Sequence, residues 1–158
     1  MKYKVLLVGL GQVGIGYDFY VADPEVISSH AKAFSSHPDF ELVGGVDPDA
    51  AACASFSSRY GTWAGSNLIE GLGLLNPEVV VIASPTQYHA EAVRQALYHA
   101  KPRLILCEKP LAYTLEEAAS MVADCRAAGC QQEGDGDGRG RHDSREGLAS
   151  VSGVTNHD

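Results

Sequence analysis

Three glycines spaced for nucleotide binding follow the first apolar segment of the chain. The loop from Gly9 to Gly14 reads GLGQVG and comes directly after Val5–Val8. In such a loop the first glycine allows a tight turn, the second lets a pyrophosphate approach the backbone, and the third lets helix and strand pack closely. The helix that follows offers N–H groups and a dipole that favour phosphate. The spacing also suits an ordinary strand-to-helix turn, so its context decides. The predicted cofactor contacts of this loop are Gly9, Gly11, Gln12, Val13 and Gly14.

An acidic residue, Asp47, ends the next predicted strand. A carboxylate at this place can accept hydrogen bonds from both adenine-ribose hydroxyls of NAD. The following Pro48 and Asp49 supply no cation for a 2′-phosphate, so the segment favours NAD over NADP. Asp47 comes later than the usual distance of about 20 residues beyond the glycines, and an insertion at residues 15–24 explains the delay. The alternative role of Asp47 is a helix N-cap, which is compatible with the first.

Two more polar segments follow predicted strands, at residues 84–89 and 107–110. Ligands bind at the carboxyl ends of strands in an open α/β sheet, so both segments should face the crevice of the glycine loop. The Lys109 ammonium could there hold a substrate hydroxyl or polarise a carbonyl. The alternative is a surface lysine paired with Glu108.

Continuous apolar runs predict strands that are covered on both faces, as in a parallel sheet. The predicted strands are Val5–Val8, Glu41–Val46, Thr62–Ala64, Val79–Ile82 and Leu104–Cys107. The predicted helices are His30–Ser36, Asp49–Tyr60, Asn67–Leu75, His89–Ala100 and a last one that Thr114 and Glu117 open as a capping box and Gly129 stops. This alternation predicts an α/β fold, a doubly wound parallel Rossmann sheet of about five strands with helices on both faces.

The composition excludes several classes of protein. With 158 residues the chain suits one domain, and a net charge of −8 argues against binding to nucleic acid or to an anionic membrane. The first apolar run is too short for a signal peptide, and no run is long enough to span a membrane. The cysteines show no metal-ligand spacing, so we expect no metal site and reduced thiols in a cytoplasmic protein. They are Cys53, Cys107, Cys125 and Cys130.

Taken together, these motifs resemble the Gfo/Idh/MocA family of oxidoreductases over about residues 1 to 126. The resemblance rests on the glycine loop, the strand ending at Asp47, the turn Ser84-Pro85-Thr86 with His89, and above all Glu108-Lys109-Pro110. It implies NAD- or NADP-dependent hydride transfer to or from a sugar, cyclitol or similar polyol. It also implies a catalytic-site role for Lys109, which Glu108 and Pro110 position. Ser84 and Pro85 would line the nicotinamide ribose. The predicted cofactor site further includes Thr86, Glu108, Lys109 and His89. We interpret the role of His89 as mainly structural.

After Arg126 the sequence departs from the family. Residues 131–141 lack apolar periodicity, so we predict a Rossmann domain at residues 1–129 and a disordered tail at 130–158. Our hypothesis is a truncated or frame-shifted member without a sixth strand and without the family's second, substrate-binding domain. The exposed strand Leu104–Cys107 would then favour self-association into a homo-oligomer.

Two functions from different classes remain open. The first is an oxidoreductase whose cofactor-binding half this chain supplies, with a sugar or polyol substrate if a second domain completes it. The second is a non-catalytic nucleotide-binding module or an inactive fragment. A methyltransferase that uses the same glycine-rich turn is a third reading, and it leaves Glu108-Lys109-Pro110 unexplained.

Overall fold

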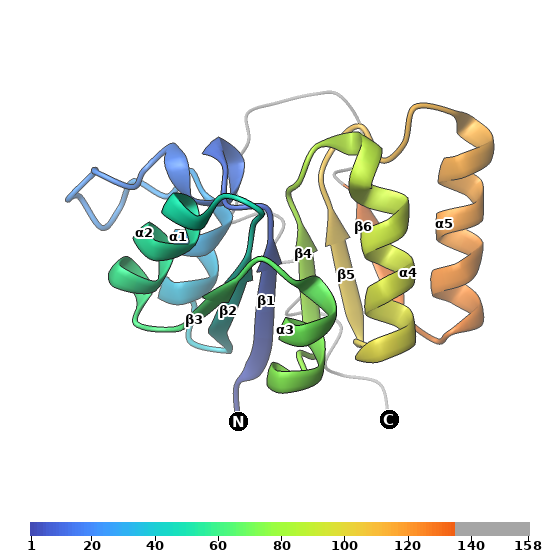
Figure 1. Cartoon of the computed structure of the whole chain (residues 1–158), viewed down its shortest axis with the longest axis horizontal. Coiled ribbons are helices and arrows are strands. Elements are labelled where there is room, and N and C mark those ends of the chain that lie inside the picture. Colours follow the sequence, from blue (N-terminus) through green and yellow to red (C-terminus); the bar gives the residue numbers. More distant parts are fainter. Residues whose placement is uncertain (135–158) are drawn as a thin grey trace.

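A single parallel sheet forms the centre of the molecule. The structure is a computed structural model that describes residues 1–134. The strands pair in the order β3-β2-β1-β4-β5-β6, and every pairing is parallel (Figure 1). They are β1 (Tyr3–Val8), β2 (Phe40–Val46), β3 (Trp63–Gly65), β4 (Val79–Ile82), β5 (Leu104–Cys107) and β6 (Gln131–Gly134). The order reverses direction between β1 and β4, as in a doubly wound Rossmann sheet, so the predicted fold class is confirmed.

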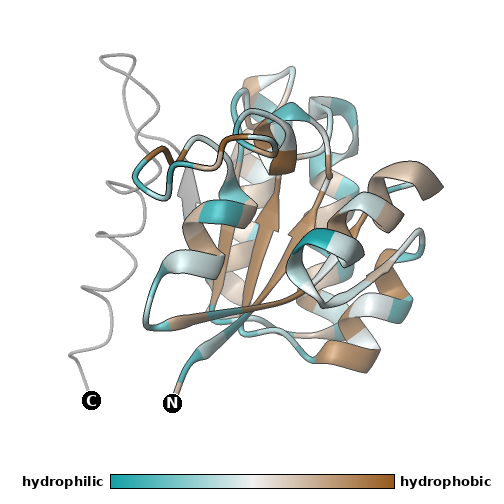
Figure 2. Cartoon of the chain, turned by 90° about the vertical axis from the view of Figure 1, so that its left-hand side faces the viewer, coloured by the Kyte–Doolittle hydropathy of each residue, from teal (hydrophilic) through white to brown (hydrophobic). Residues whose placement is uncertain are grey.

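Alternate residues of the central strands enter two separate cores, one on each face of the sheet. Val5 and Leu7 of β1 belong to the first core, whereas Leu6 and Val8 belong to the second. β4 and β5 are correspondingly hydrophobic along their whole length, and β1 is so from Val5 onward (Figure 2). Because both faces are covered there, these positions need apolar side chains. This is the reason that continuous apolar runs predicted them.

Within residues 1–134, five α-helices cover the two faces of the sheet. The first core contains residues of α1 (His30–Ser36) and α2 (Ala50–Tyr60). The second contains residues of α3 (Leu68–Leu75), α4 (His89–His99) and α5 (Leu115–Ala127). The predicted cap of the last helix is present, since the Thr114 hydroxyl accepts a hydrogen bond from the Glu117 N–H at 3.2 Å. None of the helices within residues 1–134 has the length and apolar content needed to cross a membrane.

The connection from β1 to β2 differs from a regular crossover helix. The glycine loop leads into η1 (Gln12–Gly16), one turn of π-helix, and α1 begins only at His30. The intervening insertion is anchored by Asp18, which is 1% exposed and accepts a hydrogen bond from the Ser29 N–H at 2.9 Å. Phe19 of this insertion packs on the first core and stacks edge-on with Tyr20 at 5.0 Å. The Phe19 ring thus ties the insertion to the first core.

A sixth strand extends the sheet beyond the predicted five. β6 pairs with β5 from Leu104 opposite Gln131 to Cys107 opposite Gly134. The expectation that β5 forms an uncovered sheet edge was therefore wrong. An edge strand is held by backbone hydrogen bonds on one side, so it needs no apolar run. β6 begins with two glutamines and has no apolar pattern, so the sequence did not predict it. The predicted domain boundary at residue 129 falls just before β6. The disorder of the tail remains a prediction, because residues 135–158 lie outside the described part of the chain.

The buried thiol of Cys107 makes folding stability depend on alkaline pH. Burial, followed by the negative charge of Glu108, raises the pKa of Cys107 from 9.0 to about 12. Above pH 9 the unfolded thiol loses its proton while the folded thiol retains it, so stability falls as pH rises. The loss is about 1.4 kcal/mol per pH unit between these two pKa values.

We therefore expect the free energy of unfolding by urea to fall between pH 8 and pH 10.5 by about 2 kcal/mol more in the wild type than in Cys107→Ala. Comparing the two proteins cancels the contribution of other alkaline groups, including Cys130, whose pKa is also raised to about 12. The same pH dependence in both proteins would contradict this assignment.

Candidate functional site

Backbone contacts at the end of β1 require two of the three loop glycines. Gly9 has a φ of +96°, and a Cβ on it would lie 2.5 Å from the backbone N of Ser84. A Cβ on Gly14 would overlap the carbonyl oxygen of Gly9. Only glycine can adopt the first conformation without strain and leave room at the second position. Gly9 thus allows the loop to approach the end of β4, and Gly14 allows the end of the loop to pack against its start.

Gly11 differs from its two neighbours, because a Cβ there would meet nothing within 4 Å. Its backbone is extended, with a φ of −78°, which any residue can adopt. Its carbonyl oxygen accepts hydrogen bonds from the N–H groups of Ile15 at 2.9 Å and Gly16 at 3.1 Å. Neither sterics nor conformation inside the fold requires glycine here. Among the described residues, no atom occupies the space beside Gly11 into which a Cβ would project.

That space belongs to a groove of about 800 Å³ at the carboxyl ends of β1, β2 and β4. Seven of the predicted site residues line it: Gly9, Gly11, Gln12, Val13, Asp47, Ser84 and Pro85. Five others are not among its lining residues: Gly14, Thr86, His89, Glu108 and Lys109. Gly14 instead packs beneath the loop, and Thr86 begins the short helix η2 (Thr86–Tyr88). The structure thus brings together the glycine loop, the end of β2 and the end of β4.

The Asp47 carboxylate is oriented by two backbone N–H groups. One oxygen accepts from Leu10 and the other from Asp49, each at 2.8 Å. The backbone carbonyl of Asp47 accepts from the Cys53 thiol at 3.2 Å, and burial raises the pKa of that thiol. Each carboxylate oxygen still has capacity for a second hydrogen bond. Asp47 therefore closes one end of the groove with an oriented negative charge. The cap of α2 is formed by Asp49, which accepts from the Ala51 N–H, so the alternative role of Asp47 as that cap was wrong.

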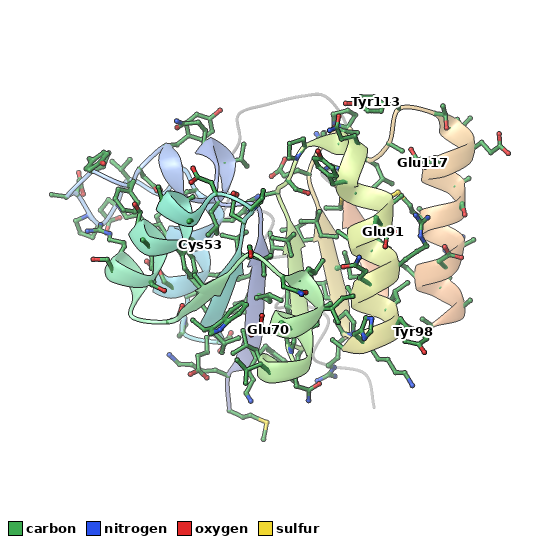
Figure 3. All side chains as sticks on the ribbon, viewed as in Figure 1. Cys53, Glu70, Glu91, Tyr98, Tyr113 and Glu117 are labelled. Carbon is green, nitrogen blue, oxygen red and sulfur yellow. The ribbon has the colours of Figure 1, made fainter. Side chains whose placement is uncertain are left out.

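The wall opposite the glycine loop comes from residues that sequence reasoning did not select. Leu68 of α3 and Ala92 of α4 line it, together with Tyr88, Glu91 and Gln95. Glu91 projects from α4 (Figure 3). Hydrogen bonds from the Gln95 amide and then from Arg94 lower the pKa of its carboxyl. The helical pattern of 89–99 predicted the helix but carried no signal for which of its residues face the groove.

His89 and Ser84 show how the end of β4 is held. His89 is 1% exposed, and its Nε2 lies 2.7 Å from the carbonyl oxygen of Ser84. Its Nδ1 lies 3.1 Å from the carbonyl oxygen of Leu111. This agrees with the mainly structural interpretation of His89. The Ser84 hydroxyl, by contrast, is buried and has no hydrogen-bond partner within the described residues.

The segment Glu108-Lys109-Pro110 lies at the same edge of the sheet, beyond the groove. The Glu108 N–H donates to the Ile82 carbonyl at 2.9 Å, which continues the pairing of β5 with β4. The Lys109–Pro110 peptide bond is cis, and Lys109 is exposed. The Oε1 of Glu108 lies 2.5 Å from the imidazole Nε2 of His30, and neither residue is among those that line the groove. Sequence reasoning placed His30 only as the start of a helix, and no local pattern indicated its partner.

Comparison with known proteins agrees with this architecture. Residues 3–133 match the profile of the Gfo/Idh/MocA family, described as an oxidoreductase family with an NAD-binding Rossmann fold. Glucose-6-phosphate 3-dehydrogenase of Bacillus subtilis is 36% identical over 96 residues, which are 61% of this chain and 26% of that protein. D-glucoside 3-dehydrogenase of Escherichia coli is 30% identical over 129 residues, which are 80% of this chain and 32% of that protein.

Solved structures show the same fold. The WlbA dehydrogenase from Bordetella pertussis, solved with NADH and UDP-GlcNAcA, superposes with a TM-score of 0.70 and 25% identity. The match covers 84% of this chain and 34% of that one. The chain thus spans about a third or less of the length of these relatives. Because the family profile extends over nearly all of the described residues, this chain belongs to the Gfo/Idh/MocA oxidoreductase family and carries its NAD-binding Rossmann fold.

Proposed function

We propose that this chain binds NAD in the groove over the glycine loop and supplies the cofactor-binding half of an oxidoreductase that acts on a hydroxyl-bearing carbon of a sugar, cyclitol or similar polyol. The observation that carries the proposal is the position of Gly11. Its backbone borders a groove of about 800 Å³, and a Cβ would stand in open space there. A pyrophosphate could lie against this backbone only if no side chain intervened.

The residues present fit a dinucleotide. Gly9, Gly11, Gln12 and Val13 would hold the pyrophosphate, and Gly14 would keep the loop in place. The oriented Asp47 carboxylate would accept hydrogen bonds from the ribose diol at the far end of the groove. At the near end, Ser84 offers a buried hydroxyl that lacks a partner within residues 1–134. Such a hydroxyl is stabilised by a ligand that completes its hydrogen bonds, so Ser84 and Pro85 suit the nicotinamide ribose, with Thr86 and His89 behind them.

Charge at the ribose end favours NAD over NADP. Asp47 lines the groove, and its Oδ1 accepts a hydrogen bond from the Asp49 N–H at 2.8 Å. A 2′-phosphate placed there would be repelled by the Asp47 carboxylate. The residues of 1–134 that line the groove include neither lysine nor arginine to offset this repulsion. A ribose hydroxyl, in contrast, can donate to the carboxylate.

Lys109 would act on the substrate. The nicotinamide, when bound, supplies the hydride acceptor or donor for a carbon that bears a hydroxyl. Lys109 follows β5, which is adjacent to β4, so its ammonium could reach the reacting hydroxyl from the side of the sheet opposite Asp47. There it could donate a hydrogen bond to the substrate oxygen and so orient the hydroxyl-bearing carbon toward the nicotinamide. Glu108 and Pro110 on either side of Lys109 would fix its direction.

The names of the relatives support the substrate class. Two of them are dehydrogenases of glucose 6-phosphate and of D-glucosides, both at carbon 3. A secondary alcohol of a hexose-like ring is therefore the first class of substrate to test.

Calorimetric titration of the full chain with NAD and NADP tests the cofactor assignment, followed by oxidation assays with glucose 6-phosphate, methyl glucoside and myo-inositol. We expect NAD to bind at least about tenfold more tightly than NADP, a difference of about 1.4 kcal/mol. If turnover is detected, Lys109→Ala should abolish it and leave the affinity for NAD unchanged. Equal binding of both dinucleotides, or binding of neither, would refute the assignment.

A nucleotide-binding module without turnover is the second candidate. The observation that favours it is that the groove residues suit a nucleotide, whereas Lys109, to which we assign the substrate, is not among the described residues that line the groove. Saturable NAD binding together with no turnover on the whole substrate panel would favour the module. NAD-dependent oxidation that is lost in Lys109→Ala would favour the enzyme.

A further inference from the structure

A largely buried contact between two polar side chains joins segments that are 78 positions apart in the sequence. The Nε2 of His30 lies 2.5 Å from Oε1 of Glu108. The His30 side chain is 7% exposed and the Glu108 side chain 17% exposed. Hydrogen bonds to an ionised group that is shielded from water are among the stronger ones in proteins. The first residue of α1 therefore restrains the residue that precedes Lys109.

The same carboxylate also reaches the backbone of Lys109. The second oxygen of Glu108, Oε2, accepts from the Lys109 N–H at 3.4 Å. The Glu108 N–H is itself fixed on the Ile82 carbonyl at 2.9 Å. One carboxylate thus bridges the His30 imidazole and the Lys109 backbone. Rotation of the Glu108 side chain would break both contacts together.

The start of α1 is a rigid support for this bridge. Asp18 accepts hydrogen bonds from the Ser28 N–H at 2.6 Å, the Ser29 N–H at 2.9 Å and the Ser29 hydroxyl at 2.5 Å. The Ser29 hydroxyl in turn caps α1 by accepting from the Lys32 N–H at 3.3 Å. Asp18 and Ser29 are each 1% exposed. The negative charge of Asp18, after burial, raises the pKa of the nearby Tyr60. His30 is thus anchored before it contacts Glu108.

We propose that His30 is a positioning residue for Lys109 and acts through the bridging carboxylate of Glu108. The proposal rests on the function proposed above, because Lys109 has its role only beside a bound dinucleotide and substrate. His30 is not among the residues that line the groove, so it acts on Lys109 and not on the cofactor. The insertion that carries Asp18 would then serve to fix the start of α1.

The test is nuclear magnetic relaxation of backbone amides in the full chain, with His30→Leu, His30→Gln and a control. Glutamine can place an amide N–H near the position of the imidazole Nε2, whereas leucine cannot donate. We expect the Lys109 amide order parameter to fall from about 0.85 to below about 0.6 in His30→Leu and to recover in His30→Gln. The control is His37→Leu at the other end of α1, where His37 lies 4.0 Å from the Asp39 carboxylate. It should leave Lys109 unchanged.

If His30→Leu does not fold, Glu108→Ala provides the second variant, because it removes both oxygens that contact His30 and the Lys109 backbone. An unchanged Lys109 order parameter in the folded variant, an equal fall in His37→Leu, or no recovery in His30→Gln would each overturn the proposal.

A titration with NAD separates this proposal from the function on which it rests. In the wild type we expect NAD to shift the amide signals of both Gly11 and Lys109. In His30→Leu the dissociation constant should stay within about twofold and the Gly11 shift should persist, while the Lys109 shift is lost. No binding of NAD to the wild type would refute the proposed function, and the order parameters would still decide the role of His30.

Discussion

Gly14→Ala should lower the melting temperature by about 10 °C, whereas Gly11→Ala should leave it within about 2 °C of the wild type and abolish measurable NAD binding. The reason lies in what each new methyl group meets. At Gly14 it overlaps the carbonyl oxygen of Gly9, a backbone atom that cannot move aside without displacing the loop. We expect a loss of about 3 kcal/mol, at the upper end of the range for overpacked sites.

At Gly11 the methyl group meets no atom within 4 Å, and a φ of −78° suits alanine. Its effect on stability should be close to zero, but it would occupy the space that we assign to the pyrophosphate. Differential scanning calorimetry and an NAD titration on both variants measure the two effects separately. Normal NAD affinity in Gly11→Ala would show that the groove over the loop is not the phosphate site, and an unchanged melting temperature in Gly14→Ala would contradict the packing argument.

Asp47→Asn should weaken NAD binding by about 10- to 100-fold and reduce the preference for NAD over NADP. Two ribose hydroxyls would lose a charged acceptor, and a hydrogen bond to a charged group contributes about 1.5–3 kcal/mol. The new amide would also face one of the N–H groups of Leu10 and Asp49, since both carboxylate oxygens accept at 2.8 Å. NADP should gain relative to NAD because the nearest negative charge is removed.

The matched control for this variant is Asp49→Asn. Asp49 is exposed, caps α2 by accepting from the Ala51 N–H at 2.9 Å, and is not among the residues that line the groove. Asp49→Asn removes one negative charge two residues from Asp47, and we expect it to change the affinity for NAD by less than about threefold. Equal losses in the two variants would mean that net charge, and not the oriented carboxylate of Asp47, determines the affinity.

The sequence identified elements whose signals are local. Val79–Ile82 and Leu104–Cys107 are continuous apolar runs, and the strands β4 and β5 have these bounds. The helix His30–Ser36 likewise has its predicted limits, because Ser29 caps it through the Lys32 N–H. β6 escaped prediction because an edge strand is specified by the backbone of its neighbour, and Gln131 and Gln132 carry no apolar pattern. The π-helical turn at Gln12–Gly16 could not be predicted either, because its backbone hydrogen bonds do not require particular residue types.

The candidate site divides in the same way. Its glycines and Asp47 could be found from the sequence because they follow strands at recognisable spacings, and parallel strands bring their carboxyl ends to one edge. The sequence assigned Gly11 to the approach of a pyrophosphate and Gly14 to close packing from their spacing alone. It could not show that the atom against which Gly14 packs is the carbonyl oxygen of Gly9, because that contact depends on where other backbone atoms lie. Nor could it place His30 against Glu108, 78 positions away. The short-range pattern of the sequence therefore determined which residues lie at the carboxyl edge of the sheet. Only tertiary packing decided which of these residues line the groove and which support their neighbours. The physical reason is that contacts between distant segments exist only once the sheet has formed.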